Sequence, residues 1–247
     1  MIYFSLFVSV VVNNILLMTT LIYLTDPNLF TATAKIEKII DTERGLAAIL
    51  DKTIFYVQGG GQPGDRGTIR NQNGSFEILK TVPGHDGDVW HLISRQEGEI
   101  QPGQEVELKI DSEFRINNSQ RHSAGHLLDL SIAKVGLKWK PTKGYHFPDG
   151  SYVEYEVDTD PGINDALINQ IQSNYDLLVD SSLDIKIEID STQTFHGQPL
   201  RTITFEGQSP CPCGGTHASN TSQLAGFKVT KMKWKNGIVK VSYTKSN

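Results

Sequence analysis

The chain has 247 residues, enough for one large domain or two smaller ones. Apolar residues make up 38% and charged residues 21% of the chain, as in an ordinary folded protein rather than one of strongly biased composition. The net charge is -5, from 23 Lys and Arg against 28 Asp and Glu. Nucleic-acid-binding proteins often carry a basic patch, so this balance argues weakly against such a partner, although a local patch would not show in the sum.

The first 17 residues are unusual in composition. No charged residue precedes Asp26, and residues 4–12 are almost wholly apolar. A secretory signal would open with positive residues and end at a small-residue cleavage site, and this segment has neither. Polar residues interrupt the apolar run before it reaches the about 20 residues of a membrane span. We therefore expect residues 1–17 to be an extension ahead of a natural start at Met18. A signal or anchor and an integral strand are the alternatives.

From Leu21 to Ile110, short apolar runs alternate with turn residues, a pattern typical of a small barrel or sandwich. The expected strands are Thr33–Ile40, Leu46–Leu50, Thr53–Val57, Gly67–Arg70, Phe76–Val82, Val89–Leu92 and Val106–Ile110. We predict an N-terminal β-barrel domain over residues 18–112.

The pattern changes near Ser112 and becomes helical from Asn118. A first helix is expected over Asn118–Val135, capped by the Asn-Asn-Ser segment that starts at 117 and ended by Gly136. A second helix is expected over Pro161–Leu178. The expected strands are Tyr152–Val157, Leu183–Ile189, Leu200–Phe205, Gly226–Trp234 and Ile238–Tyr243, with a hairpin turn at Asn236-Gly237. This order predicts an α+β domain over residues 113–247, with helices packed on an antiparallel sheet.

The last strands are rich in lysine. Six lysines and no acidic residue lie between Lys228 and Lys245. Such a segment is typical either of a nucleic-acid-binding patch or of a solvated strand edge that lysines protect from pairing. The sequence leaves both interpretations open.

The two cysteines, Cys211 and Cys213, are separated by one proline. This spacing is too short for ordinary disulfide geometry, so we expect no disulfide framework and a reducing compartment, the cytoplasm. Cysteines beside a histidine indicate metal chemistry instead.

Two four-residue spacings carry the metal hypothesis. His122 and His126 share one face of the first expected helix, where two imidazoles can bind one ion. Cys213 and His217 flank a glycine-rich segment whose backbone can turn tightly enough to aim both side chains at one point. Imidazole and thiolate ligands suit zinc better than magnesium or calcium.

The kind of zinc site stays open at this stage. Position 123 is Ser, whereas zinc peptidases place their catalytic Glu after the first His, so a peptidase is disfavoured. Four protein ligands are typical of a closed structural site, and a catalytic site keeps one position open. The ion is therefore either structural or catalytic, with one loop ligand yielding to water or substrate.

These motifs resemble those of a known family. R-H-S-A-G-H-L-L at 121–128 and P-C-G-G-T-H at 212–217 are similar to motifs of the alanyl-tRNA synthetase editing domain and of the zinc-binding second domain shared with threonyl-tRNA synthetase. Four further segments resemble the free-standing editing family AlaX: L-I-Y-L-T-D, F-Y-V-Q-G-G-G-Q-P-G-D-R-G, K-G-Y-H-F-P-D-G and V-S-Y. The resemblance covers residues 18–247 and includes no synthetase catalytic core.

The resemblance implies a small N-terminal β-barrel followed by a zinc-binding α+β domain like the second additional domain of threonyl- and alanyl-tRNA synthetases. It implies Zn²⁺ bound by His122, His126, Cys213 and His217, and it leaves the catalytic groups beyond this zinc site unknown. The implied reaction is hydrolysis of the ester between serine, or glycine, and the 3′ adenosine of mischarged alanine tRNA.

Substrate contacts also follow from the resemblance. Gly59, Gly60 and Gly61 match the glycine motif of the family's medium-length members, which implies a wall of the amino-acid pocket; a barrel turn without a ligand role is the alternative. Val57 stands where the family pattern has Pro.

Lys143, Tyr145 and His146 are expected near the tRNA acceptor end, with Lys143 at a phosphate and Tyr145 on a base. A polar hairpin loop is the alternative for this segment. The expected partner is alanine-specific tRNA with a mischarged 3′ end. No membrane contact is expected, and the protein is expected to be a monomer or a weak homodimer.

Two other functions remain open from the sequence. The first is a non-catalytic tRNA-binding module with a structural zinc, which four protein ligands would favour. The second is a zinc hydrolase of another small ester or amide.

Overall fold

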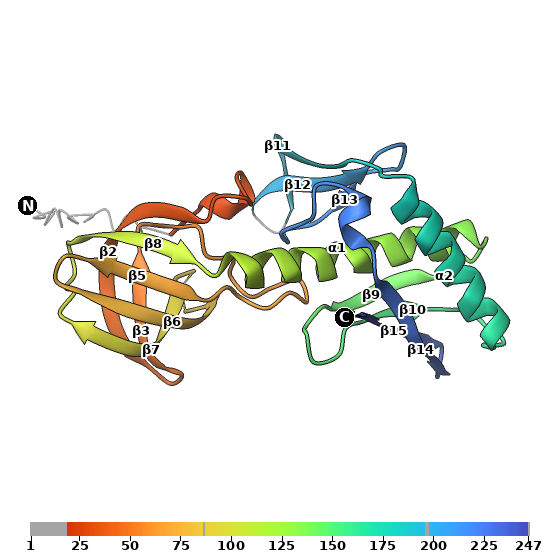
Figure 1. Cartoon of the computed structure of the whole chain (residues 1–247), viewed down its shortest axis with the longest axis horizontal. Helices are drawn as coiled ribbons and strands as arrows, with labels where there is room; N and C mark the ends of the chain where they lie inside the picture. Colours follow the sequence, from red (N-terminus) through yellow and green to blue (C-terminus); the bar gives the residue numbers. More distant parts are fainter. Residues whose placement is uncertain (1–18, 86, 196–197, 247) are drawn as a thin grey trace, which may run out of the picture.

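The computed structural model describes residues 19–85, 87–195 and 198–246. Figure 1 shows a barrel at one end of the molecule and a unit of helices and sheets at the other, with the long helix α1 (Ser112–Lys134) running between them. The extension expected over residues 1–17 lies outside the described residues. Within the described part of the chain, no helix combines the length and apolarity needed to cross a bilayer.

Six strands of the described chain close into a barrel in the order β2-β3-β7-β6-β5-β8. They are β2 (Thr31–Thr42), β3 (Gly45–Leu50), β5 (Gly67–Asn71), β6 (Gly74–Pro83), β7 (Val89–Gly98) and β8 (Glu105–Ile110). Beside them lie the parallel pair β1 (Thr20–Leu21) and β4 (Lys52–Thr53) and the 3₁₀ turn η1 (Ile22–Leu24). Ile36, Phe76 and Leu108 are among the side chains that fill the interior. The predicted barrel is confirmed.

The strand expected over Thr53–Val57 is wrong beyond its first residue. The apolar residues that follow β4 are buried, but several of their backbone groups bond to side chains rather than to a neighbouring strand. The carbonyl of Ile54 accepts from Arg115, and the N–H of Tyr56 donates to Asp65. Because buried backbone groups need partners from any source, these contacts allow a buried loop where the sequence pattern predicted a strand.

α1 begins at Ser112, ahead of the expected start at Asn118. Its N-cap is Asp111, whose side chain accepts from the N–H of Phe114 at 3.0 Å. The expected start is wrong because the polar first turns look like a break in the apolar pattern. In the structure one side of those turns is buried, with Arg115 1% and Asn118 0% exposed, whereas Ile116 on the other side is 46% exposed.

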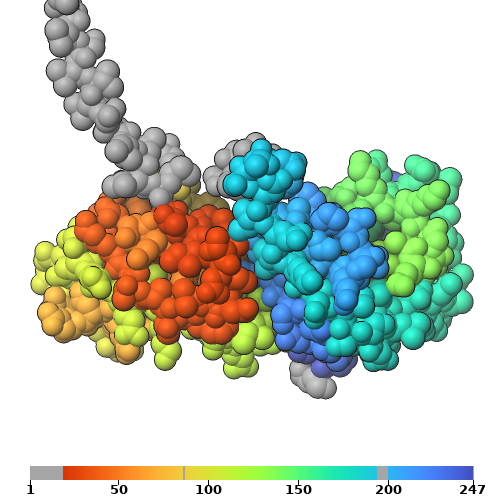
Figure 2. Space-filling view, turned by 90° about the horizontal axis from the view of Figure 1, so that it is seen from above, coloured from red at the N-terminus to blue at the C-terminus, as the bar shows by residue number. Residues whose placement is uncertain are grey.

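The second unit holds two antiparallel sheets, β14-β15-β10-β9 and β11-β12-β13, and the helix α2 (Asp165–Asp180). Its strands are β9 (Lys140–Tyr145), β10 (Tyr152–Glu156), β11 (Ile185–Phe195), β12 (Gln198–Phe205), β13 (Cys211–Pro212), β14 (Phe227–Lys235) and β15 (Ile238–Lys245), and a 3₁₀ turn η2 covers Thr221–Leu224. In the space-filling view, this unit (green to blue) lies directly against the barrel (red to yellow) (Figure 2).

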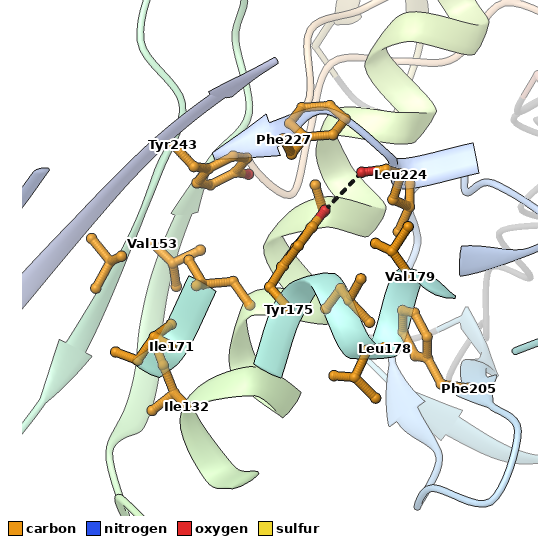
Figure 3. Close-up of a cluster of buried hydrophobic side chains, with 14 of the residues drawn as sticks. Ile132, Val153, Ile171, Tyr175, Leu178, Val179, Phe205, Leu224, Phe227 and Tyr243 are labelled. Carbon is orange, nitrogen blue, oxygen red and sulfur yellow. Dashed lines mark hydrogen bonds between the residues drawn. The ribbon is translucent and has the colours of Figure 1, made fainter. Parts of the chain in front are cut away.

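The core of the second unit lies between the helices and the larger sheet. Figure 3 shows apolar side chains of α2, such as Ile171 and Leu178, facing those of neighbouring elements, such as Val153 and Phe227. The buried hydroxyl of Tyr175 donates to the carbonyl of Leu224 at 3.3 Å. The predicted α+β class is confirmed.

Three local predictions fared differently. The hairpin at Asn236-Gly237 joins β14 to β15 and is confirmed, with φ of 51° and 78° as a type I′ turn requires. α2 starts at Asp165 rather than at Pro161, because the side chain of Asn164 caps it by accepting from a backbone N–H at 2.9 Å. β9 was not expected, because this exposed edge strand lacks alternating apolar residues.

A buried ion pair joins α1 to the barrel. The side chains of Arg115 and Asp65 are 1% and 0% exposed. Arg115 Nε donates to Asp65 Oδ2 at 2.8 Å, and Nη2 contacts the same oxygen. The guanidinium also donates to the carbonyls of Pro27 and Ile54 at 2.7 and 2.6 Å. One side chain therefore connects the first turn of α1 to several segments of the N-terminal unit.

We predict that Arg115→Met lowers the free energy of unfolding by about 3–5 kcal/mol, because it leaves Asp65 buried without its partner. The matched control is Arg70→Met, which removes the exposed partner of Glu107 and should cost less than about 1 kcal/mol. Urea unfolding of both variants at neutral pH provides the measurement. A similar loss of unfolding free energy in the two variants would contradict the conclusion that Arg115 stabilises the contact between α1 and the barrel.

Candidate metal centre

Four side chains meet where α1 faces the loop after β13. The ligand atoms of His122, His126, Cys213 and His217 all lie within 4.8 Å of one another. Cys213 Sγ is 3.5 Å from His122 Nε2 and 3.3 Å from His217 Nε2. The structure thus brings together the ligand set that the sequence motifs suggested.

Two elements hold these side chains. His122 and His126 lie one turn apart on α1, with their rings stacked at 5.2 Å between centroids. The loop is tied to β12, because Cys213 N donates to the carbonyl of Arg201 at 3.0 Å and Arg201 Nη1 donates to the carbonyl of Cys213 at 2.6 Å. One backbone bond and one side-chain bond thus hold the loop against β12.

Gln62, from the barrel, determines the tautomer of His122. The Thr216 N–H donates to Gln62 Oε1 at 3.1 Å, so this oxygen is an acceptor, and Gln62 Nε2 donates to Thr216 Oγ1 at 2.7 Å. His122 Nδ1 lies 2.8 Å from the same Oε1 and must therefore carry the proton. That leaves the lone pair of Nε2 directed toward Cys213.

The other two imidazoles have polar neighbours beside Nδ1, at longer distances. His217 Nδ1 is 3.2 Å from Ser123 Oγ, which also accepts from the backbone N–H of Ala218 at 3.0 Å. His126 Nδ1 is 3.9 Å from a carboxylate oxygen of Asp129, whose other oxygen accepts from the Tyr155 hydroxyl at 2.6 Å. A carboxylate or hydroxyl behind a ligating imidazole is the usual way to orient it and raise its basicity.

The protonation states suit metal binding. Burial lowers the pKa of His126 to about 4 and holds the pKa values of His122 and His217 well below the usual imidazole value, so all three rings are neutral near neutral pH. Burial also raises the pKa of the Cys213 thiol to about 11, so this thiol needs a bound cation to lose its proton. Among the described residues, His126 Nε2 is buried without a hydrogen-bond partner. A soft cation would satisfy this nitrogen, so the donor set fits zinc.

A cavity of about 350 Å³ opens onto the cluster. Its lining includes His122, His126, Lys143 and the half-buried Cys213. Gly60 also borders it.

A second cavity, of about 460 Å³, lies across the Cys213 loop. Tyr23, Tyr56 and Arg201 line it, and Gly60 and Gly214 border both cavities. Within the part of the chain that the structure describes, Arg201 Nη2 is buried and has no hydrogen-bond partner. The cluster of candidate ligands therefore has a cavity on each side of the Cys213 loop, and each cavity can hold an organic group.

The glycine motif forms a tight turn beside the cluster. Gly59 and Gln62 exchange backbone hydrogen bonds of 3.3 and 2.8 Å. Gly60 and Gly61, at the tip, have φ of 53° and 77°, a conformation that favours glycine. A Cβ on Gly60 would stand 3.9 Å from the ring of His122, whereas one on Gly61 would clash with the backbone of Gly144. The turn therefore approaches both the metal site and β9.

The residues expected near the tRNA acceptor end, Lys143, Tyr145 and His146, differ in their environments. His146 is buried against His122, with ring centroids 4.5 Å apart, and its Nδ1 is hydrogen-bonded to the Tyr243 hydroxyl. Lys143 is exposed at the rim of the smaller cavity. The ring of Tyr145 stacks on Phe147 at 4.5 Å, so the stacking expected with a base is made here within the protein.

Several residues that contact the candidate ligands are not predicted by the sequence motifs. Gln62, Ser123 and Thr216 lie inside the quoted motifs, but their spacing gave no sign that they hold the histidines. Arg201 and Asp129 lie outside those motifs or at their ends, and only the fold brings them to the site. Their signal would have been polar residues within otherwise apolar or glycine-rich runs.

Comparison with known proteins agrees with this architecture. Residues 22–114 match the family described as tRNA synthetases class II (A). Residues 200–240 match the threonyl and alanyl tRNA synthetase second additional domain. The fold and the histidine–cysteine cluster thus place the chain among proteins related to the editing parts of alanyl-tRNA synthetases.

Similar proteins of known name define the family more closely. The chain is 32% identical to the alanyl-tRNA editing protein AlaX-M of Pyrococcus horikoshii over 87% of this chain and 91% of that protein. It is 31% identical to AlaX-L of the same organism over 85% of this chain and 54% of that protein. It is 30% identical to the alanine–tRNA ligase of Clostridioides difficile over 78% of this chain but only 23% of the ligase. The chain belongs to the AlaX family of alanyl-tRNA editing proteins.

We predict that Gly215→Ala weakens zinc binding at least about tenfold, since orienting contacts around ligands are worth that much. A Cβ at this position would stand 2.1 Å from His122 Cε1, so the imidazole would have to move. Gly214→Ala is the matched control in the same loop, because a Cβ there meets nothing within 4 Å. Competition with a chromogenic chelator gives both affinities. Equal zinc affinity in the two variants would contradict the placement of His122 as a ligand.

Proposed function

We propose that this protein hydrolyses the ester bond of mischarged alanine tRNA, removing serine or glycine from the 3′ adenosine. The single observation that carries the proposal is the cluster of three imidazoles and one thiol at the edge of a cavity. Membership in a family whose relatives are named alanyl-tRNA editing proteins supports the tRNA substrate. The cytoplasm, where aminoacyl-tRNA is used, is the proposed location.

The metal in this proposal is zinc, bound by His122, His126, Cys213 and His217. When bound, it would supply a polarised water or substrate carbonyl at the cavity. The chain's own groups have separate tasks. Gln62 holds His122 in the tautomer that leaves Nε2 free, and Ser123 positions the ring of His217 through Nδ1.

The glycine turn is proposed to hold the reacting ester. The two hydrogen bonds of the turn do not use the N–H groups of Gly60 or Gly61. Backbone N–H groups near a developing oxyanion stabilise it without reorganisation. We therefore assign Gly59–Gly61 to the wall of the amino-acid pocket, with Lys143 and His146 near the terminal nucleotide.

A separate hydrolase is chemically reasonable for serine. A pocket built for alanine rejects one extra hydroxyl only weakly, whereas a second site that hydrogen-bonds this hydroxyl can select for it. The same argument applies less strongly to glycine, which lacks a group to recognise.

We expect the purified protein to deacylate Ser-charged alanine tRNA and to spare Ala-charged tRNA, and a chelator should abolish this activity. His126→Ala serves as the metal-free variant, because it removes the buried imidazole nitrogen that lacks a protein partner. Release of radiolabelled amino acid and zinc content are measured on the same samples. Tight tRNA binding without hydrolysis in zinc-loaded protein would favour the non-catalytic module. Hydrolysis of small esters without tRNA affinity would favour an unrelated esterase.

The glycine turn provides an independent test. Gly60→Ala should reduce the rate of Ser-tRNA hydrolysis more than it lowers thermal stability, because its Cβ would point toward His122 and both cavities. Gly103→Ala is the control: it also has a positive φ, of 89°, but lies in a barrel turn with nothing within 4 Å. Both positions have a positive φ that favours glycine, so both variants carry backbone strain, which the stability measurement records. If the hydrolysis rate falls only in proportion to thermal stability in both variants, the glycine motif is only a turn.

A further inference from the structure

The larger sheet of the second unit has one face on the core and one face open to solvent. Val153, Val239 and Val241 point into the core. Residues that lie directly opposite one another on neighbouring strands share a face, and the register therefore defines the outer face. Its three cross-strand rows are Lys233–Lys240–Glu154–Lys143, Lys231–Ser242–Tyr152–Tyr145 and Lys235–Ile238–Glu156–Lys140. We call this set the lysine face.

The charge of the lysine face is opposite to that of the protein. Over the described strands it carries six lysines against two glutamates, on a chain with net charge -5. Glu156 is paired with Lys140 at 3.7 Å, and Glu154 stands between Lys240 and Lys143 in the register. The carboxylates are thus confined to β10, and the lysines of β14 form an exposed positive margin.

A column of aromatic rings stiffens this face. Tyr145 stacks on Phe147 and on Tyr152, with centroids 4.5 and 5.2 Å apart. Lys240 Nζ lies 3.3 Å from the centroid of Tyr152, and Lys143 Nζ lies 5.7 Å from it. These cation–π contacts favour positions of the two ammonium groups above one ring, and such preorganisation reduces the entropy lost when they meet an anion.

The lysine face continues into the candidate active site. β9 is its edge strand, and Lys143 both belongs to the face and lines the cavity beside His122 and His126. A polyanion lying along the face would therefore reach the metal cluster at the β9 edge, with the lysines of β14 at the other end of its path.

We propose that the lysine face binds the RNA backbone of the tRNA acceptor end and directs its 3′ terminus over β9 into the cavity. This inference rests on the proposed function for the identity of the RNA. Alternate residues along a strand are roughly 6.6–6.8 Å apart, so the lysines present charges in rows suited to a phosphate chain. A lipid surface would also attract lysines, but faces that bind membranes add apolar side chains for insertion. Here the aromatic rings are stacked on one another and Ile238 is half-buried.

The test compares two triple variants. Lys231→Gln, Lys233→Gln and Lys240→Gln remove three charges from the lysine face while leaving Lys143 in place. The control triple, Lys38→Gln, Lys80→Gln and Lys109→Gln, removes three charges from barrel strands β2, β6 and β8. Melting temperature and zinc content establish that both remain folded with an intact metal site.

Binding of uncharged alanine tRNA is then measured over a series of salt concentrations. We expect the lysine-face triple to bind at least about tenfold more weakly, and its slope of log affinity against log salt to fall by about 2–3, near 0.7–0.9 per lost phosphate contact. The control triple should bind within about twofold of the unmodified protein. In Ser-tRNA hydrolysis, the lysine-face triple should show a raised KM with kcat little changed.

Two results would overturn the inference: an unchanged salt slope in the lysine-face triple, or equal losses in both triples. Binding of anionic lipid vesicles that tRNA does not displace would assign the face to a membrane instead. A different result would contradict the proposed function alone. If the unmodified protein binds tRNA through this face but hydrolyses neither Ser-tRNA nor the seryl ester of adenosine, the surface stands and the deacylase does not.

Discussion

The ion pair between Arg115 and Asp65 is the constraint on which the candidate site depends. Arg115 stands in the first turn of α1, the same helix that carries His122 and His126. Asp65 follows the glycine turn and also accepts from the N–H of Tyr56, at the start of the loop that bears the turn. A pair this deeply buried is stable only when each charge keeps its partner. It therefore holds the helix that carries two candidate metal ligands and the loop that faces them in one geometry.

Two side chains connect the candidate metal centre to the N-terminal unit. Gln62 comes from the barrel, yet its amide oxygen sets the tautomer of His122 on α1 and accepts from Thr216 in the Cys213 loop. Arg201 also joins the two units, since it donates to the carbonyl of Leu24 in the N-terminal unit at 3.0 Å and to that of Cys213 in the second unit. All four candidate ligands come from the second unit, where Ser119 and Ser123 of α1 also contact the Cys213 loop. The N-terminal unit adds the contact that orients His122.

The distribution of charge matters more than its sum. The overall charge of -5 argued weakly against a nucleic-acid partner, and the lysine-rich end of the chain had two interpretations. Cross-strand pairing aligns Lys233 with Lys240, and Lys240 with Glu154 and Lys143, across four strands. Only this register shows that lysines from separate segments share one face and that this face reaches the cavity.

The sequence by itself determined the barrel, the α+β second unit and the four metal-ligand candidates. These follow from local information: apolar periodicity, turn residues such as Asn236-Gly237, and pairs of ligands four residues apart. Tertiary structure alone decided the start of α1, the loop at Ile54 and the partners of each imidazole. In these cases a buried polar group bonds to a residue far away in the sequence, as Arg115 does with Ile54. Because such bonds depend on which segments the fold brings together, no local pattern records them.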